Sequence, residues 1–173
     1  MVHDIKGAIR YLRDHSGDFG YNNQNFAITG SSSGGHLAAL VGITNGHPDL
    51  EGTIGGHTDT SSEVQAIISY FGASDLTTIL SQSTPFGLGV REPALQALLG
   101  ALPEDDPETA KLASPVNHVD MSDPPLLLFH GDRDPQMPIN QAHQLEGAYE
   151  TLGLDVQFDP VHGAAHGGAE FYD

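Results

Sequence analysis

Hydrophobic residues recur along this chain with two spacings, one typical of helices and the other typical of strands. In residues 2–15 the apolar positions lie three or four apart, which predicts an amphipathic helix. Apolar runs at residues 26–30, 64–71 and 126–129 predict three strands, the first of them buried and the third central in a parallel sheet. Residues 154–158 alternate between apolar and polar side chains, which predicts a fourth strand.

Helical patterns separate these strands. Pro93 falls in the first turn of one predicted helix, where proline is tolerated, and Gly153 ends the last one. Polar segments without periodicity, at residues 17–25 and 44–62, are expected to be loops. Strands that alternate with helices predict parallel pairing, and therefore an α/β fold with a mostly parallel sheet flanked by helices. The predicted helices cover residues 33–43, 76–80, 93–99, 107–112 and 139–152.

Composition narrows the class of protein. The 173 residues are 38% hydrophobic and contain no long apolar run and no recognisable signal peptide, which indicates a soluble protein without a membrane span, its compartment left open. The formal net charge of −17, from 23 acidic and 6 basic residues, makes nucleic acids and anionic membranes poor partners. Cysteine is absent, which excludes disulfides and thiol ligands.

The most informative motif lies between the first strand and the helix that follows it. Residues 30–36 read GSSSGGH, which contains the G-x-S-x-G pattern of a nucleophile elbow. In such a turn only the central serine, Ser32, presents its hydroxyl outward. Gly30 and Gly34 are expected at their positions because a side chain would clash with the neighbouring chain segment.

A serine hydroxyl becomes a nucleophile when a histidine removes its proton and a carboxylate orients that histidine. In open parallel sheets such groups gather beyond the carboxyl ends of the strands. Residues 130–134, HGDRD, follow the third predicted strand, and residues 161–168, VHGAAHGG, follow the fourth. The chain order is therefore serine, acid, histidine. The candidate acids are Asp132 and Asp134, and the candidate bases are His162 and His166.

These segments carry a resemblance to a known family. The chain resembles the α/β-hydrolase fold, and most closely the bacterial acyl-esterase branch related to feruloyl esterases, acetyl-sugar esterases and hormone-sensitive-lipase-type enzymes. The resemblance implies Ser32 as nucleophile, Asp134 as acid and His166 as base, with the N–H of Ser33 as one donor to the oxyanion. It implies no cofactor and no metal. The segments that carry it are GSSSGGHLA at 30–38, SPV at 114–116 with DPP at 123–125, HGDRD at 130–134, and GAAHG at 163–167.

Other residues remain as alternatives. Asp132 competes as the acid, although we expect it to shape its turn through a local Asx hydrogen bond, and His162 competes as the base. His36 and His130 are expected to be structural. A metal site built from three residues of one polar loop is a further alternative, but their spacing matches no common zinc pattern. Those three residues are His47, His57 and Asp59.

The chain also departs from the family pattern. Family members carry further strands upstream, and a loop after one of them supplies a second N–H to the oxyanion hole. We therefore expect residues 1–173 to form one N-terminally incomplete domain. Its strand at 26–30 would be an unpaired edge, which predicts a homo-oligomer or an upstream segment that completes the sheet. Losing the second donor is expected to lower the rate about a hundred- to a thousandfold.

The function predicted from the sequence is that of a serine esterase acting on short-chain acyl or acylated-carbohydrate esters, with a small-molecule ester as its partner. Two alternatives stay open. One is a serine peptidase of the prolyl-oligopeptidase type, which shares the order of catalytic residues. The other is a weakly active or non-catalytic hydrolase remnant that serves as an assembly module.

Overall fold

The computed structural model describes residues 1–172 and contains a four-stranded sheet in the order β1-β2-β3-β4. All neighbouring strands are parallel, so their carboxyl ends lie at one edge of the sheet. The predicted α/β class with a parallel sheet is confirmed. The strands are β1 (Ala27–Ser31), β2 (Ala66–Tyr70), β3 (Leu126–Gly131) and β4 (Val156–Val161).

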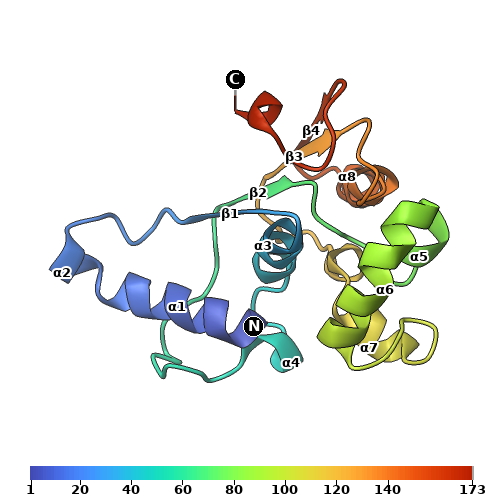
Figure 1. The fold of residues 1–173 in the computed structure, drawn as a ribbon. Coiled ribbons are helices and arrows are strands. Elements are labelled where there is room, and N and C mark those ends of the chain that lie inside the picture. The colour runs from blue at the N-terminus through green and yellow to red at the C-terminus, as the bar shows by residue number, and fades with distance from the viewer. Residues whose placement is uncertain (173) are drawn as a thin grey trace.

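The α-helices gather on one side of the sheet, and the C-terminal turn η2 lies on the other (Figure 1). Every helix within residues 1–172 is too short or too polar to reach across a bilayer. The helices are α1 (Val2–Asp14), α2 (Ser16–Phe19), α3 (Ser33–Ile43), α4 (Pro48–Glu51), α5 (Ile79–Gln82), α6 (Pro85–Leu99), α7 (Pro107–Leu112) and α8 (Asn140–Leu152), with 3-10 turns η1 (Pro115–His118) and η2 (Ala169–Phe171).

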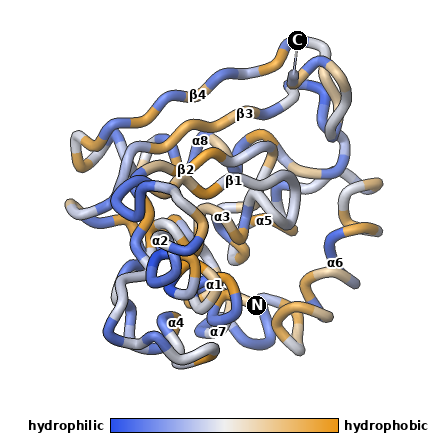
Figure 2. The backbone as a smooth tube through the Cα atoms, turned by 90° about the vertical axis from the view of Figure 1, so that its left-hand side faces the viewer, coloured by the Kyte–Doolittle hydropathy of each residue, from blue (hydrophilic) through white to orange (hydrophobic). Residues whose placement is uncertain are grey.

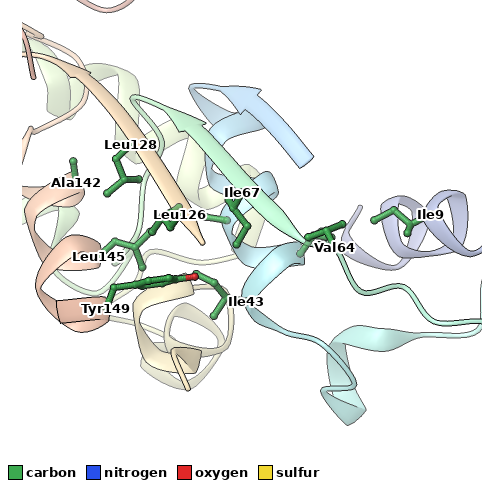
Figure 3. Packing of buried hydrophobic residues seen from close by; sticks show 11 residues of the cluster. Ile9, Ile43, Val64, Ile67, Leu126, Leu128, Ala142, Leu145 and Tyr149 are labelled. Carbon is green, nitrogen blue, oxygen red and sulfur yellow. The ribbon is translucent and has the colours of Figure 1, made fainter. Parts of the chain in front are cut away.

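The main core lies between the sheet and the helices α3 and α8 (Figure 3). Ile67 of β2 and Leu126 of β3 point into it and are almost fully buried. Tyr149 of α8 is fully buried, and its hydroxyl donates to the carbonyl of Pro124. Burying each large apolar side chain contributes about 1.5–3 kcal/mol, so this layer fixes the sheet that carries the site.

The opposite face of the sheet is only half covered. β2 and β3 consist mainly of hydrophobic residues (Figure 2), and on this face Tyr70 stacks on Phe129 with ring centroids 4.8 Å apart. At the edge of the sheet formed by residues 1–172, β1 pairs with β2 alone, and its residues Ala27 and Thr29 are exposed. The prediction that the first strand is an edge is confirmed, and the prediction that it is buried is wrong.

The helix predicted to begin at Pro93 begins earlier. α6 starts at Pro85, after Thr84, whose hydroxyl accepts a hydrogen bond from the N–H of Gly87 (3.0 Å). Pro93 therefore lies inside the helix, where it removes one backbone hydrogen bond. Thr84 is a preferred N-cap residue, and its side-chain cap sets the start of the helix at Pro85.

Other element boundaries differ more modestly from the prediction. The fourth strand runs to Val161 and includes Pro160, which an edge strand tolerates because one side of it makes no ladder hydrogen bonds. The short helix predicted at 76–80 lies at Ile79–Gln82. The two segments expected to be loops contain the single-turn helices α2 and α4.

A buried ionic group ties α4 to α1. Lys6 Nζ lies 3.0 Å from Glu51 Oε2, and Arg10 Nη1 lies 2.8 Å from Glu51 Oε1. Both cations are almost fully buried. Arg10 Nη2 also donates to the carbonyl of Ile54 (3.0 Å). The start of the polar segment that follows α4 is therefore anchored to α1.

Candidate active site

Ser32 occupies a strained turn between β1 and α3. Its backbone angles are φ 56° and ψ −120°, a conformation that is uncommon for a residue with a side chain. The N–H of Ser32 donates to the carbonyl of Tyr70 on the neighbouring strand (2.9 Å). The turn is therefore fixed to β2, and it presents Ser32 at the carboxyl edge of the sheet.

Two glycines make this turn possible. A Cβ at Gly30 would lie 2.2 Å from the carbonyl oxygen of Gly34, as expected from the motif. The expectation for Gly34 is wrong, because a Cβ there would meet nothing within 4 Å. The second tight position is Gly35, where a Cβ would lie 2.8 Å from the carbonyl oxygen of Tyr70. Close packing of α3 on β2 therefore requires the second glycine of the pair.

The structure brings Ser32, Asp134 and His166 together from three separate loops at the carboxyl edge. His166 Nε2 lies 2.8 Å from Ser32 Oγ, and His166 Nδ1 lies 2.6 Å from Asp134 Oδ2. An ionised carboxylate can only accept hydrogen bonds, so Nδ1–H donates to Asp134 and Nε2 is left to accept from the serine hydroxyl. This arrangement can move a proton from the serine oxygen to the imidazole.

The carboxylate of Asp134 is fully buried but well satisfied. Its Oδ1 accepts from the N–H groups of Gln136 (2.8 Å) and Met137 (2.9 Å), and its Oδ2 lies 3.4 Å from His130 Nε2. Burial by itself would raise the pKa of Asp134, but hydrogen bonds from His130, His166 and the two N–H groups outweigh it and hold the pKa below its usual value. Asp134 is therefore a carboxylate at neutral pH.

The ring of Phe71 packs against the imidazole of His166, a contact that the sequence analysis missed. It follows β2 directly, and its ring centroid lies 4.7 Å from that of His166 and 4.8 Å from that of Phe171. Its φ of 41° is unusual for a bulky residue. Only its position at the carboxyl end of a predicted strand could have drawn attention to it, since no sequence pattern marks a phenylalanine with positive φ.

The alternative acid and the alternative base bind each other. Asp132 Oδ2 lies 3.0 Å from His162 Nδ1, and Asp132 Oδ1 accepts from the N–H of Gly163 (2.7 Å). The expected local Asx hydrogen bond of Asp132 is therefore wrong, because this carboxylate joins two loops. His36 is buried, with Nδ1 3.1 Å from the carbonyl oxygen of Ala73, and burial lowers its pKa.

A cavity of about 290 Å³ opens beside Ser32. Ser33, the first residue of α3, also lines it, and its backbone N–H lies at the positive end of that helix. Arg91 brings a guanidinium to the wall, and its Nε donates to the carbonyl of Gln136 (3.2 Å). The sequence analysis missed Arg91 because it began the helix at Pro93, two residues after Arg91, whereas α6 begins at Pro85. The apolar wall includes Leu76, Ile79, Leu95, Leu98 and Met137.

The three residues weighed as a metal site from one loop do not meet. His57 Nδ1 lies 2.8 Å from Asp14 Oδ2 of the first helix. His47 packs edge-on against His118, with ring centroids 5.0 Å apart, and Asp59 is exposed.

Comparisons with known proteins agree with this geometry. The BD-FAE family model matches residues 1–149. Esterase LipQ and Esterase LipC of Mycobacterium tuberculosis (strain ATCC 25618 / H37Rv) are each 31% identical to this chain over 165 residues, which cover 94% and 95% of it. The aligned parts make up 37% of LipQ and 40% of LipC, so the chain spans well under half the length of these relatives.

Solved structures show the same fold. A truncated form of a carbohydrate esterase from gut microbiota matches with a TM-score of 0.85 and 34% identity, over 95% of this chain and 60% of that one. Esterase 2 of the Planctomycetes species Thermogutta terrifontis, with propionate bound, matches with a TM-score of 0.71 and 32% identity, over 96% of this chain and 55% of that one. The expected resemblance to α/β-hydrolases is confirmed for the described residues.

Proposed function

The chain belongs to the BD-FAE family, and from that premise we propose that it is a serine esterase that hydrolyses short-chain acyl or acylated-carbohydrate esters. The observation that carries the proposal is the continuous hydrogen-bonded relay from Ser32 Oγ through His166 to Asp134, with contacts of 2.8 and 2.6 Å. Neither contact requires a side chain to move before proton transfer. Relatives with esterase names support the same chemistry.

The reaction proceeds in two stages. Ser32 Oγ attacks the acyl carbonyl while His166 Nε2 takes its proton, and the resulting imidazolium then protonates the leaving alkoxide. Asp134 keeps the imidazole in the required tautomer and stabilises its charged form. In the second stage His166 removes a proton from water, and the hydroxide attacks the acyl-serine. The intermediate then breaks its bond to Ser32 Oγ, which takes the proton back from the imidazolium, and the carboxylic acid leaves.

The N–H of Ser33 stabilises the tetrahedral oxyanion in this proposal. It lies next to the nucleophile and at the N-terminus of α3, where the helix carries partial positive charge. A backbone donor of this kind contributes a factor of about a hundred to a thousand in rate.

The lining of the cavity restricts which acyl chains and alcohols the substrate can contain. Its wall is mostly apolar, which suits a short acyl chain better than a polar one. Arg91 gives the same cavity a charged donor that can bind a hydroxyl or carbonyl oxygen of the alcohol part. The overall charge of −17 disfavours the approach of anionic esters. A carbohydrate esterase among the structural neighbours supports acylated sugars as the alcohol part.

The proposal is tested by replacing the nucleophile and its neighbour in parallel. We expect Ser32→Ala to lower kcat/KM for p-nitrophenyl acetate by at least about a thousandfold and to abolish labelling by a fluorophosphonate probe. Ser31→Ala, one residue away and exposed, is the matched control and should keep both. Undiminished turnover by Ser32→Ala would end the proposal, and faster cleavage of p-nitroanilide peptides than of esters would favour a peptidase.

A further inference from the structure

A cluster of metal-ligating side chains lies at the end of α1, apart from the cavity beside Ser32. Asp14, His15 and His57 each offer one ligand atom, and these atoms all lie within 4.8 Å of one another. His57 reaches the helix from a loop 43 residues further along, where its Nδ1 lies 2.8 Å from Asp14 Oδ2. None of the three residues lines the cavity beside Ser32.

The His15 ring is oriented by a backbone oxygen, and the His57 ring faces the carboxylate of Asp14. His15 Nδ1 lies 2.9 Å from the carbonyl oxygen of Tyr11, and the His15 ring stacks on that of Tyr11 with centroids 4.1 Å apart. The His57 ring meets the His15 ring edge-on at 5.2 Å. When Nδ1–H of His15 donates to this carbonyl oxygen, Nε2 keeps its lone pair for a metal, and such a partner behind the ring is the usual support of a metal-binding histidine. His57 would bind through Nδ1, the nitrogen that faces Asp14.

The backbone also holds His57 in this position. Its φ of 54° is uncommon for a residue with a side chain. The segment that leads to it is fixed to α1 at Ile54, whose carbonyl accepts from the buried Arg10. The cluster therefore lies on an anchored loop and a helix terminus. The negative end of the α1 dipole at this terminus favours a bound cation.

We propose that Asp14, His15 and His57 bind one divalent transition-metal ion, with Zn²⁺ as the preferred ion. Imidazole nitrogen suits zinc, copper and nickel, and a carboxylate oxygen completes a set that zinc accepts. Two ligand atoms of a tetrahedral zinc ion lie about 3.3 Å apart, so Asp14 and His57 would separate slightly from 2.8 Å, and no pair of ligand atoms would need to close by more than about 1.5 Å. Three protein ligands leave a position for water. The ion would have a structural role, because it would crosslink the loop of residues 52–62 to α1.

The test uses the full chain without a histidine tag, stripped with EDTA. Titration with ZnCl₂ followed by calorimetry should show one strong site per chain, and zinc should raise the Tm in a way that EDTA reverses. His15→Gln and His57→Gln should each weaken zinc binding at least about tenfold. His143→Gln, on an exposed histidine that pairs with Glu146 on α8, is the matched control and should bind zinc like the unaltered chain.

Folding and binding are separated by a second measurement. Circular dichroism in EDTA should be the same for all variants. If one histidine variant fails to fold, Asp14→Asn serves as the replacement ligand variant.

Zinc should also shift the imidazole proton resonances of His15 and His57 in NMR spectra. The proposal is overturned if the chain shows no 1:1 site at a free zinc concentration of about 100 µM. It is also overturned if the cluster variants bind zinc as tightly as His143→Gln.

Discussion

Asp132 Oδ2 lies 3.0 Å from His162 Nδ1, so a second carboxylate–imidazole pair stands beside the one formed by Asp134 and His166. The two pairs differ in their surroundings. The His162 side chain is 83% exposed and has no serine partner, whereas the His166 side chain is 11% exposed and reaches Ser32. The same residue types therefore form a pair between surface loops and a pair at the candidate nucleophile.

The two histidines are expected to respond differently to replacement. His166→Ala should lower kcat/KM for p-nitrophenyl acetate by at least about a thousandfold, because within residues 1–172 the side chain that hydrogen-bonds to Ser32 Oγ is that of His166. His162→Ala should retain activity within about threefold, since the pair it removes is exposed and such pairs contribute little to stability. Steady-state kinetics of both variants check this, and an equal loss in the two would contradict the assignment of the base.

Replacing the buried acid is expected to change activity and acid stability together. Asp134→Asn should lower kcat by about ten thousandfold, because an amide at this position favours the wrong imidazole tautomer. The hydrogen bonds that lower the pKa of Asp134 also stabilise the fold. This contribution is complete above the unfolded pKa of 3.8 and is lost as the pH falls below it.

Urea unfolding between pH 2 and pH 6 measures that second effect. The free energy of unfolding should fall more steeply below about pH 4 in the unaltered chain than in Asp134→Asn. Parallel curves for the two proteins would show that the ionised carboxylate is not stabilised in the native state.

The sequence could predict Ser32, Asp134 and His166 as candidates because each follows a strand whose apolar pattern is clear. Parallel strands place their carboxyl ends together, so position along the chain translates into position in space. The second tight glycine was assigned to Gly34 instead of Gly35, since the motif specifies small residues but not which of them meets the neighbouring strand.

The wall of the cavity could not be predicted in the same way. α6 depends on a side-chain cap at Thr84 that competes with the proline signal at Pro93. The result places Arg91 in the wall of the cavity that Ser32 also lines, although nothing in its local sequence marks it. Likewise, the pairing of Asp132 with His162 depends on how two loops approach each other, which no local pattern describes.

Phe71 offers a test of how far packing positions the base. Phe71→Gly removes the ring that contacts His166 but suits a backbone with φ 41°. We expect kcat to fall about ten- to a hundredfold with KM nearly unchanged, because the imidazole loses its fixed orientation. Phe71→Leu keeps more apolar bulk and should lose less. A change in KM alone would indicate that Phe71 contacts the substrate instead.

A last prediction concerns Asp123, which lies before β3 and outside the site. Burial raises the pKa of Asp123 to about 7. The N–H of Asp120 donates to its carboxylate (2.8 Å) and opposes the shift, while the charge of Asp120 adds to it. Because the native state holds this proton more tightly than the unfolded state, the contribution of Asp123 to stability falls as the pH rises from about 4 to about 7, and it levels off above that range.

Asp123→Asn should therefore stabilise the protein by an amount that depends on pH. The asparagine side chain stays neutral and can still accept from the N–H of Asp120, so it avoids the cost of ionising a half-buried carboxylate. The gain in unfolding free energy over the unaltered chain should be small near pH 4, grow up to about pH 7 and remain constant above it. Asp18→Asn, at an exposed position on α2, is the matched control and should show no such trend. A gain that is independent of pH would mean that Asp123 ionises as readily in the folded protein as in the unfolded chain.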